Sequence, residues 1–156
     1  MLKNLNVRMG TIINDASATL LSQAYIDSVA RLSLIVGTGA NSAIYLPVPA
    51  IAREKFGDRP KEWYEAADNV IVNTELSLFG NGFLPSTRWD ETLNRCHAQP
   101  DFQPLEFRVG GLYLSELVRL ICIEAICDGG LFRGCMPAKF DEPYSVDTKL
   151  LADLES

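Results

Sequence analysis

The first part of the chain alternates between a short apolar run and a longer segment of helical composition. Residues 7–13 are apolar and β-branched, which predicts a buried strand that ends at the polar pair Asn14 and Asp15. Residues 17–30 are rich in Ala and Leu and predict a helix whose cap lies near Asp15 or Ser17. The polar pair is therefore expected where a strand gives way to a helix, which is where α/β proteins hold reactive groups.

Three more strand-like runs follow. Residues 32–36 and 42–46 predict neighbouring strands joined through a Gly-Thr-Gly turn, in a hairpin-like return. Residues 53–65 are charged and come after two prolines, so they predict a surface excursion with one short helix. Residues 70–75 predict a third strand that ends in polar side chains.

The second half of the chain has a mainly helical pattern. Residues 87–95 predict one helix, and residues 106–127 carry the strongest helical signal, ended by Gly129 and Gly130. In the longer segment the apolar stripe consists of Leu114, Leu117, Val118, Ile121 and Ala125, with Glu116, Arg119 and Glu124 off the stripe. Residues 141–156 are polar and predict a solvated tail.

Composition narrows the classes of partner. The 156 residues, 47% of them hydrophobic, suit one globular domain, and a net charge of -6 argues against nucleic acid, which needs a clustered basic surface. No apolar run reaches the roughly 18 residues of a membrane span, so we expect no membrane partner. The four cysteines and the single His97 match no zinc framework; we expect no bound metal, and reduced thiols in the cytoplasm.

Polar residues at the ends of the predicted strands suit phosphoryl transfer to a sugar. Such a site needs a carboxylate to accept the hydroxyl proton, polar groups to hold the sugar, and donors for phosphate oxygens. Asp15 is the candidate base, and Thr38, between Gly37 and Gly39, is the candidate phosphate contact. The candidate sugar contacts, whose amides and carboxylates suit vicinal hydroxyls, are Asn14, Asn41, Glu75 and Glu106.

Each of these residues taken alone also has an ordinary structural explanation. Asp15 suits a helix N-cap, and the Gly-Thr-Gly sequence suits a plain turn. Glu75 suits a solvated strand end, and Glu106 suits the first turn of a helix, where the helix dipole favours a carboxylate. The order of the motifs along the chain is what separates the two interpretations.

That order resembles the hexokinase family. The family's pattern of a strand, Asn-Asp, a small-residue helix and Ile-Val-Gly-Thr-Gly-x-Asn-x-x-Tyr is present in residues 13–45. The family's Asn-Thr-Glu strand end appears at residues 73–75, and residues 84–90 are similar to a Leu-Pro-x-Thr-x-x-Asp helix entry of fungal members. Residues 113–120 resemble the family's Tyr-Leu-Gly-Glu-Leu-Val-Arg-Leu helix.

The resemblance implies the actin-like, ribonuclease-H-like α/β fold of sugar kinases, with a mixed sheet flanked by helices. Residues 1–140 would be the central part of the large domain, followed by a polar tail at 141–156. The implied reaction is ATP-dependent phosphorylation of a hexose at its 6-hydroxyl, with Mg²⁺ and with Asp15 as the base. Asn14, Asn41, Glu75 and Glu106 match sugar-binding positions, and Thr38 matches the second phosphate-binding turn.

Three sites depart from the family pattern. Leu76-Ser77 replaces the aromatic-Gly pair after Asn-Thr-Glu, which should reshape the wall behind the sugar. This variant resembles an atypical fungal branch that includes N-acetylglucosamine kinase-like proteins. Ala16 stands where the family has Thr, and Ser115 stands where it has Gly.

Two segments of the family pattern have no counterpart in this sequence: the Asp-x-Gly-Gly-Thr phosphate loop and the Gly-rich segment that holds adenosine. Because phosphoryl transfer depends on positioning and charge stabilisation, we expect a central fragment with impaired activity. The alternative is a non-catalytic sugar-binding or regulatory protein, paired with a second chain that covers exposed apolar edges. A third possibility is a truncated product with no function of its own.

Overall fold

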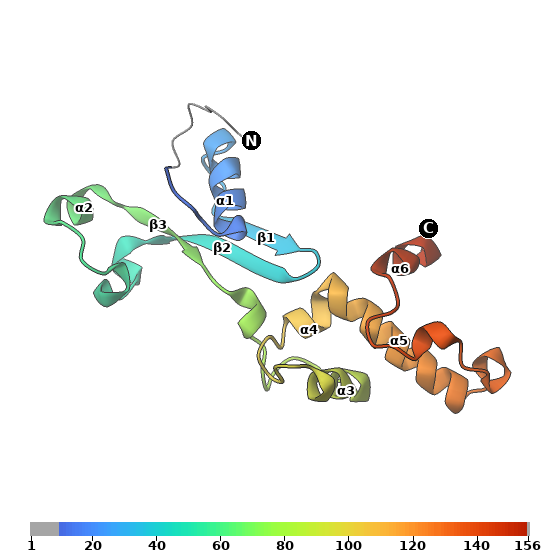
Figure 1. The fold of residues 1–156 in the computed structure, drawn as a ribbon. Coiled ribbons are helices and arrows are strands. Elements are labelled where there is room, and N and C mark those ends of the chain that lie inside the picture. The colour runs from blue at the N-terminus through green and yellow to red at the C-terminus, as the bar shows by residue number, and fades with distance from the viewer. Residues whose placement is uncertain (1–9, 156) are drawn as a thin grey trace, which may run out of the picture. The chain divides into compact units, whose positions relative to one another are not determined.

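The computed structural model describes residues 10–155, which form two compact units (Figure 1). The first unit contains the described chain up to Ser33 together with Ser42–Thr74. The second unit contains Leu34–Asn41 and the chain from Glu75 onwards. The hairpin tip at Leu34–Asn41 therefore packs with a region that comes much later in the chain.

The main elements of the early chain are a helix and a three-stranded sheet: α1 (Asp15–Ile26), β1 (Leu32–Val36), β2 (Ala40–Pro47) and β3 (Asn69–Asn73). The strand order is β1-β2-β3, and β2 pairs antiparallel with β3, placing Ala43 opposite Asn73. Between β2 and β3 lie two 3-10 turns and a short helix: Val48–Ala50, Arg53–Phe56 and α2 (Lys61–Ala66). The predicted surface excursion with a short helix is thus confirmed.

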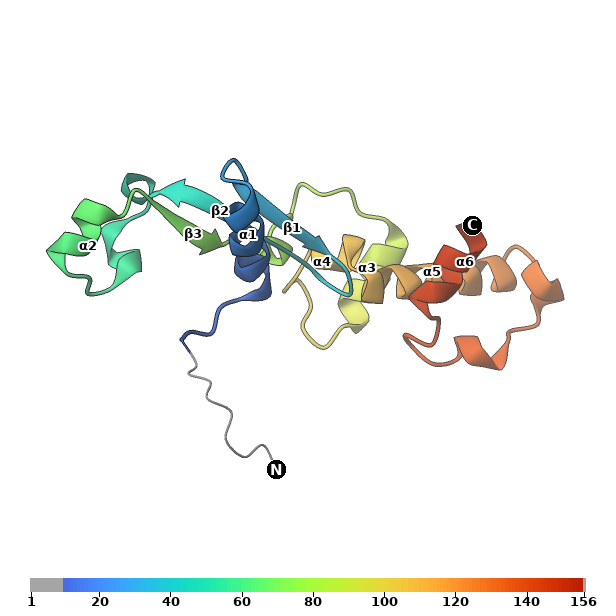
Figure 2. The same ribbon diagram turned by 90° about the horizontal axis from the view of Figure 1, so that it is seen from above.

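Small side chains bring α1 close to the sheet in the first unit. Ala16 and Leu20 of α1 and Ala43 of β2 are completely buried, and Figures 1 and 2 show α1 beside β1 and β2. The buried Ser33 hydroxyl donates to the Ala16 carbonyl at 2.7 Å. The Ser42 hydroxyl donates to the Ser33 carbonyl at the same distance, so both buried hydroxyls have acceptors.

The strand expected at residues 7–13 is not present in its described part. Residues 7–9 lie outside the described residues, and residues 10–13 are irregular, with the Ile12 side chain 83% exposed. An apolar run becomes a strand only when a neighbour satisfies its backbone groups, and no ladder includes residues 10–13. Helix α1 begins at Asp15, earlier than expected, because Asn14 caps it.

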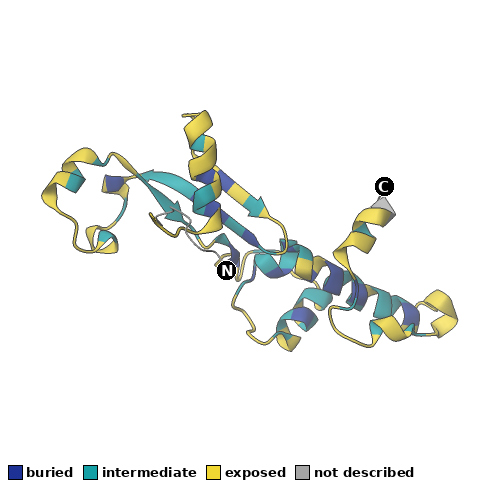
Figure 3. Ribbon diagram, turned by 45° about the horizontal axis from the view of Figure 1, so that its top comes forward, coloured by how far each residue is buried: buried dark blue, intermediate teal, exposed yellow. Residues whose placement is uncertain are grey.

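The second unit is helical: α3 (Arg88–Cys96), α4 (Glu106–Val109), α5 (Gly111–Cys127) and α6 (Thr148–Glu155). A capping box between Thr87 and Asp90 begins α3. The core consists of Leu93, Phe107 and Tyr113, with Leu117 and Leu120 packed against it. Figure 3 shows buried residues along α5 and α3, whereas the excursion between β2 and β3 is largely exposed.

The long helical segment differs from its prediction in two respects. The expected helix at 106–127 is divided into α4 and α5 by Gly110, whose backbone is extended. A side chain at this glycine would also lie only 3.0 Å from the Thr38 carbonyl oxygen. Within α5 the charged residues Glu116 and Arg119 are buried as an ion pair with a 2.7 Å contact, while Leu114 and Ile121 of the predicted stripe are exposed.

The polar segment at 141–156 is more ordered than the solvated tail that its composition predicts. It contains α6, and Val146 is only 5% exposed. Two 3-10 turns, Leu131–Gly134 and Ala138–Phe140, connect α5 to this segment. The backbone amide of Tyr144 donates to the Glu116 carboxylate at 2.7 Å, which fixes the segment to α5.

Candidate functional site

Asn14 and Asp15 stand at the start of α1, in the first unit. The Asn14 side chain caps the helix, because its Oδ1 atom accepts from the Ala16 amide at 2.9 Å. Asp15 is the first helical residue, and its carboxylate also accepts from that amide at 2.8 Å. The Asp15 side chain is exposed. The N-cap role that the sequence left open for Asp15 therefore belongs to Asn14, and the Asp15 carboxylate faces solvent beside a helix N-terminus.

The Gly-Thr-Gly turn joins β1 to β2 and belongs to the second unit. It closes on itself through a 2.8 Å hydrogen bond from the Gly37 amide to the Gly39 carbonyl. The Gly37 and Thr38 carbonyls accept from the Gly111 and Leu112 amides at 2.7 and 3.2 Å. Within residues 10–155 the Thr38 hydroxyl and the amides of Thr38 and Gly39 make no hydrogen bond to another protein group, so all three are available as donors.

Glu106, the first residue of α4, closes one side of this turn. Its Oε2 atom accepts from the Ala40 amide at 2.9 Å. The contact is tight, because a Cβ built on Gly39 would lie 2.5 Å from the same oxygen. Glycine at position 39 is therefore what lets the carboxylate approach the turn.

In the second unit, Asn41 contacts the segment that begins at Glu75. The Asn41 Oδ1 atom accepts from the Leu76 amide at 3.3 Å, next to Glu75. Glu75 adopts a left-handed conformation (φ 49°, ψ 48°), which is uncommon for a residue with a side chain, and precedes a 3-10 turn at Leu76–Leu78. Its side chain is exposed, while those of Asn41 and Glu106 are half-buried.

The second unit thus holds six of the eight candidate residues, and the first unit holds Asn14 and Asp15. It also adds a residue that the sequence did not single out. The side-chain amide of Gln103 donates to the Ser77 hydroxyl at 3.4 Å, so Gln103 lies against the segment that follows Glu75. Nothing in the hydrophobic pattern marks Gln103; its position three residues before Glu106 was the available signal.

The charge of Glu106 acts on one tyrosine of the helical core, Tyr113. Burial raises the pKa of Tyr113, and the charge of Glu106 raises it further. The Tyr113 hydroxyl lies 3.4 Å from the Nε2 atom of His97, whose ring packs on Phe107 at 4.6 Å between centroids. Tyr113 therefore stays protonated at neutral pH.

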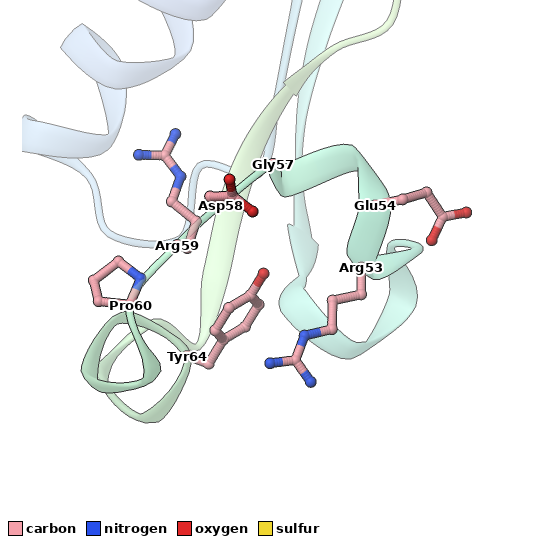
Figure 4. Close-up of a pocket in the computed structure, with 7 residues that line it drawn as sticks. All are labelled: Arg53, Glu54, Gly57, Asp58, Arg59, Pro60 and Tyr64. Carbon is pink, nitrogen blue, oxygen red and sulfur yellow. The ribbon is translucent and has the colours of Figure 1, made fainter.

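A cavity of about 770 Å³ lies elsewhere in the first unit, on the excursion between β2 and β3 (Figure 4). None of the eight candidate residues lines it. Arg53 stacks on Tyr64 at 4.5 Å, Arg59 lies over Trp63 at 5.7 Å, and Figure 4 shows the two guanidinium groups pointing apart. The arginines are thus committed to aromatic rings and do not converge on one ligand.

Two classes of site are absent from the described residues. No group of three or more His, Cys, Asp or Glu side chains is placed to hold a metal ion within residues 10–155. In the same part of the chain no helix is long and apolar enough to cross a membrane.

Comparison with known proteins gives consistent matches. The family model described as hexokinase matches residues 31–156. Hexokinase-1 of Schizosaccharomyces pombe is 32% identical over 155 residues, covering 96% of this chain and 30% of that protein. Hexokinase-2 of Saccharomyces cerevisiae is 30% identical over 155 residues, covering 98% of this chain and 32% of that protein.

The structure gives the same result. A hexokinase from Schistosoma mansoni, complexed with glucose, matches with a TM-score of 0.82 and 33% sequence identity. The match covers 97% of this chain and 33% of that one. This chain therefore spans about a third of the length of the relatives that it matches.

Proposed function

The chain belongs to the hexokinase family, and from that premise we propose that it takes part in ATP-dependent phosphorylation of a hexose at its 6-hydroxyl. It contains part of the actin-like sugar kinase fold. Within that fold, the proposal places residues 1–140 in the central part of the large domain, as the sequence motifs imply. The observation that carries the proposal is the clustering of Gly37–Gly39, Asn41, Glu75 and Glu106 in one unit. The four cysteines are free, which suits a reducing cytoplasmic setting.

In this proposal Asp15 accepts the proton of the attacking hydroxyl. An exposed carboxylate at a helix start can act as a general base once the substrate hydroxyl lies within hydrogen-bond reach. The hexose is held by amide and carboxylate groups that can bond pairs of hydroxyls: Asn14, Asn41, Glu75 and Glu106. The Leu76-Ser77 departure leaves open whether glucose or N-acetylglucosamine is preferred, so both sugars belong in the test.

The phosphate-binding role falls to the Gly-Thr-Gly turn. Its three available donors, the Thr38 hydroxyl and the amides of Thr38 and Gly39, suit phosphate oxygens. ATP would supply the transferred phosphoryl group, and Mg²⁺ is commonly held by substrate phosphates with one or two carboxylates. No residue of this chain is assigned to Mg²⁺ or to adenosine.

The test is a coupled phosphotransfer assay with Mg-ATP and either glucose or N-acetylglucosamine, run on the parent chain and on Asp15→Asn. Loss of a positioned general base should lower the rate by about 10²–10⁴-fold. Sugar binding, measured by calorimetry, should persist in Asp15→Asn. The matched control is Asp27→Asn, because Asp27 is an aspartate at the other end of α1 whose carboxylate accepts from the Val29 amide at 3.0 Å. Turnover by Asp15→Asn at the parent rate would refute the role of Asp15.

A second candidate is a non-catalytic sugar-binding or regulatory protein that pairs with another chain. It is favoured by the exposed apolar side of α1, where Tyr25 is 93% and Ile26 is 80% exposed. Sugar binding without turnover, together with a larger assembled mass when a complete hexokinase is added, would support this candidate. A folded chain that neither binds sugar nor transfers phosphate would overturn both candidates.

A further inference from the structure

The C-terminal segment reaches the Gly-Thr-Gly turn through α5. Its near end is held by Glu116, which accepts from the Tyr144 amide, and by Arg119, whose guanidinium donates to the Phe140 carbonyl. Val146 is buried in the same stretch. At the start of α6 the Thr148 hydroxyl then donates to the carbonyl of Gly111 at 2.7 Å.

Gly111 is the residue that joins this segment to the turn. Its amide donates to the Gly37 carbonyl at 2.7 Å, while its carbonyl accepts from Thr148. A Cβ built on Gly111 would lie 3.0 Å from the Gly37 oxygen and 3.7 Å from the Thr148 methyl group. The first residue of α5 is therefore enclosed between the turn and Thr148.

A helix that begins with glycine needs such support. Gly110 and Gly111 lack side chains, so ordering the start of α5 costs more conformational entropy than it would with any other residue type at these two positions. The first amides of a helix also have no partner inside it. Here the Gly111 and Leu112 amides are satisfied by the Gly37 and Thr38 carbonyls, so order at the start of α5 and order in the turn depend on each other.

We propose that Thr148 is a positioning residue for the phosphate-binding turn. Its hydroxyl fixes the Gly111 peptide, and that peptide fixes the Gly37 and Thr38 carbonyls. The remaining donors of the turn, the Thr38 hydroxyl and the Thr38 and Gly39 amides, are thereby held in one arrangement. The functional meaning of this inference rests on the proposed phosphate-binding role of the turn.

The deciding experiment is amide hydrogen exchange by NMR on the full chain, comparing Thr148→Val, Thr148→Ser and the parent. A neutral hydrogen bond contributes about 0.5–1.5 kcal/mol, which corresponds to an exchange rate about 2–10-fold faster when it is lost. We expect that acceleration at the Gly111 and Leu112 amides in Thr148→Val. The amides of Leu117 and Leu120, inside α5, should keep their parent rates. Thr148→Ser retains the hydroxyl and should restore protection.

The matched control is Thr92→Val. Thr92 makes an equivalent bond, from its hydroxyl to the Arg88 carbonyl at 2.9 Å, within α3 of the same unit. Its replacement should leave exchange at Gly111 and Leu112 unchanged. Unchanged exchange at these two amides in Thr148→Val would overturn the positioning role. Equal acceleration along all of α5 would overturn it as well, because that result indicates general destabilisation.

A second measurement separates this inference from the proposed function. Inorganic phosphate is titrated while the Thr38 and Gly39 amide resonances are followed, and we expect Thr148→Val to bind about 2–10-fold more weakly than the parent. A parent chain that shows no phosphate-dependent shift would count against the proposed role of the turn. The exchange data would still decide whether Thr148 positions it.

Discussion

Replacing Gly39 with alanine tests how closely Glu106 approaches the turn. The new Cβ would lie 2.5 Å from Oε2 and 3.0 Å from Cδ of Glu106, too close for either atom to stay in place. The carboxylate is the free end of a flexible side chain, so we expect it to swing away. The loss is then its 2.9 Å hydrogen bond to the Ala40 amide.

The magnitude follows from two opposing contributions. A hydrogen bond to a charged group contributes about 1.5–3 kcal/mol. A Gly-to-Ala change also restricts the unfolded chain, which stabilises the protein by about 0.4–1 kcal/mol. Gly37→Ala shares this second contribution, and its Cβ would meet nothing within 4 Å. The unfolding free energies of the two variants should therefore differ by about 1.5–3 kcal/mol, with Gly39→Ala the less stable.

The assay is urea unfolding followed by tryptophan fluorescence. The chain has two tryptophans, Trp63 in the first unit and Trp89 in the second, so a Trp63→Phe background reports on the second unit alone. Equal stability of the two alanine variants would refute the reasoning. A further check places both changes in a Glu106→Ala background, where the difference between them should vanish.

Two other perturbations probe the second unit. Glu116→Gln should lower its unfolding free energy by about 3 kcal/mol, because the change leaves the buried Arg119 guanidinium without a charged partner. Urea unfolding measures this loss, and Glu65→Gln, which breaks the exposed pair with Lys61, should show no measurable change. The second perturbation is pH. Burial raises the pKa values of both Tyr113 and Tyr144, so the native state keeps these protons at a pH where the unfolded chain, with a tyrosine pKa near 10, has lost them. The contribution of these two tyrosines to stability should therefore be constant below about pH 9 and fall as the pH rises through 10, with a smaller fall in Tyr113→Phe.

Each of these two predictions can be contradicted by one result. A Glu116→Gln protein as stable as the parent would show that the Arg119 charge is well solvated in the folded state. A urea midpoint that does not change between about pH 8 and 11 would show that the tyrosines ionise alike in the folded and unfolded chain.

Local signals in the sequence were sufficient for several elements. The sequence predicts the strand at Leu32–Val36 with its observed limits, because its mainly apolar run stops at a glycine. The third strand was predicted at 70–75 and is observed at Asn69–Asn73. Helix α3 begins directly after Thr87, where a capping box is visible in the sequence. In each case residues next to the element in the sequence mark where it starts or ends.

The sequence was misleading where backbone groups or buried charges decide the structure. The segment at 141–156 is held through the Tyr144 amide and the Phe140 carbonyl, and backbone groups have no signature in composition. On α5 the predicted apolar stripe is only partly correct: Leu117 packs against the core, whereas Leu114 and Ile121 are exposed. Glu116 and Arg119 are buried instead, because their charges neutralise each other. A periodicity count treats both residues as surface positions.

The candidate site divides in the same way. Family resemblance identified the residue types at all eight positions, and their chemical roles stay predictions. The grouping of Glu106 with the Gly-Thr-Gly turn depends on contacts between distant segments, which no local pattern contains. The local sequence pattern gives no sign of Gln103 for the same reason, because its partner Ser77 is distant in the sequence. Ser77 is also a departure from the family pattern.

The distance along the chain between the turn and its partners also affects how the protein is made. Ala40 and Glu106 are 66 residues apart in sequence, and a ribosome adds about 5–20 residues per second. The turn therefore waits roughly 3–13 s after its own synthesis before Glu106 has been added. Closing so long a loop is also slower than forming local helices. The hairpin that carries Thr38 is thus synthesised well before Glu106, and it can reach this final contact only after that interval, during which it is exposed to misfolding.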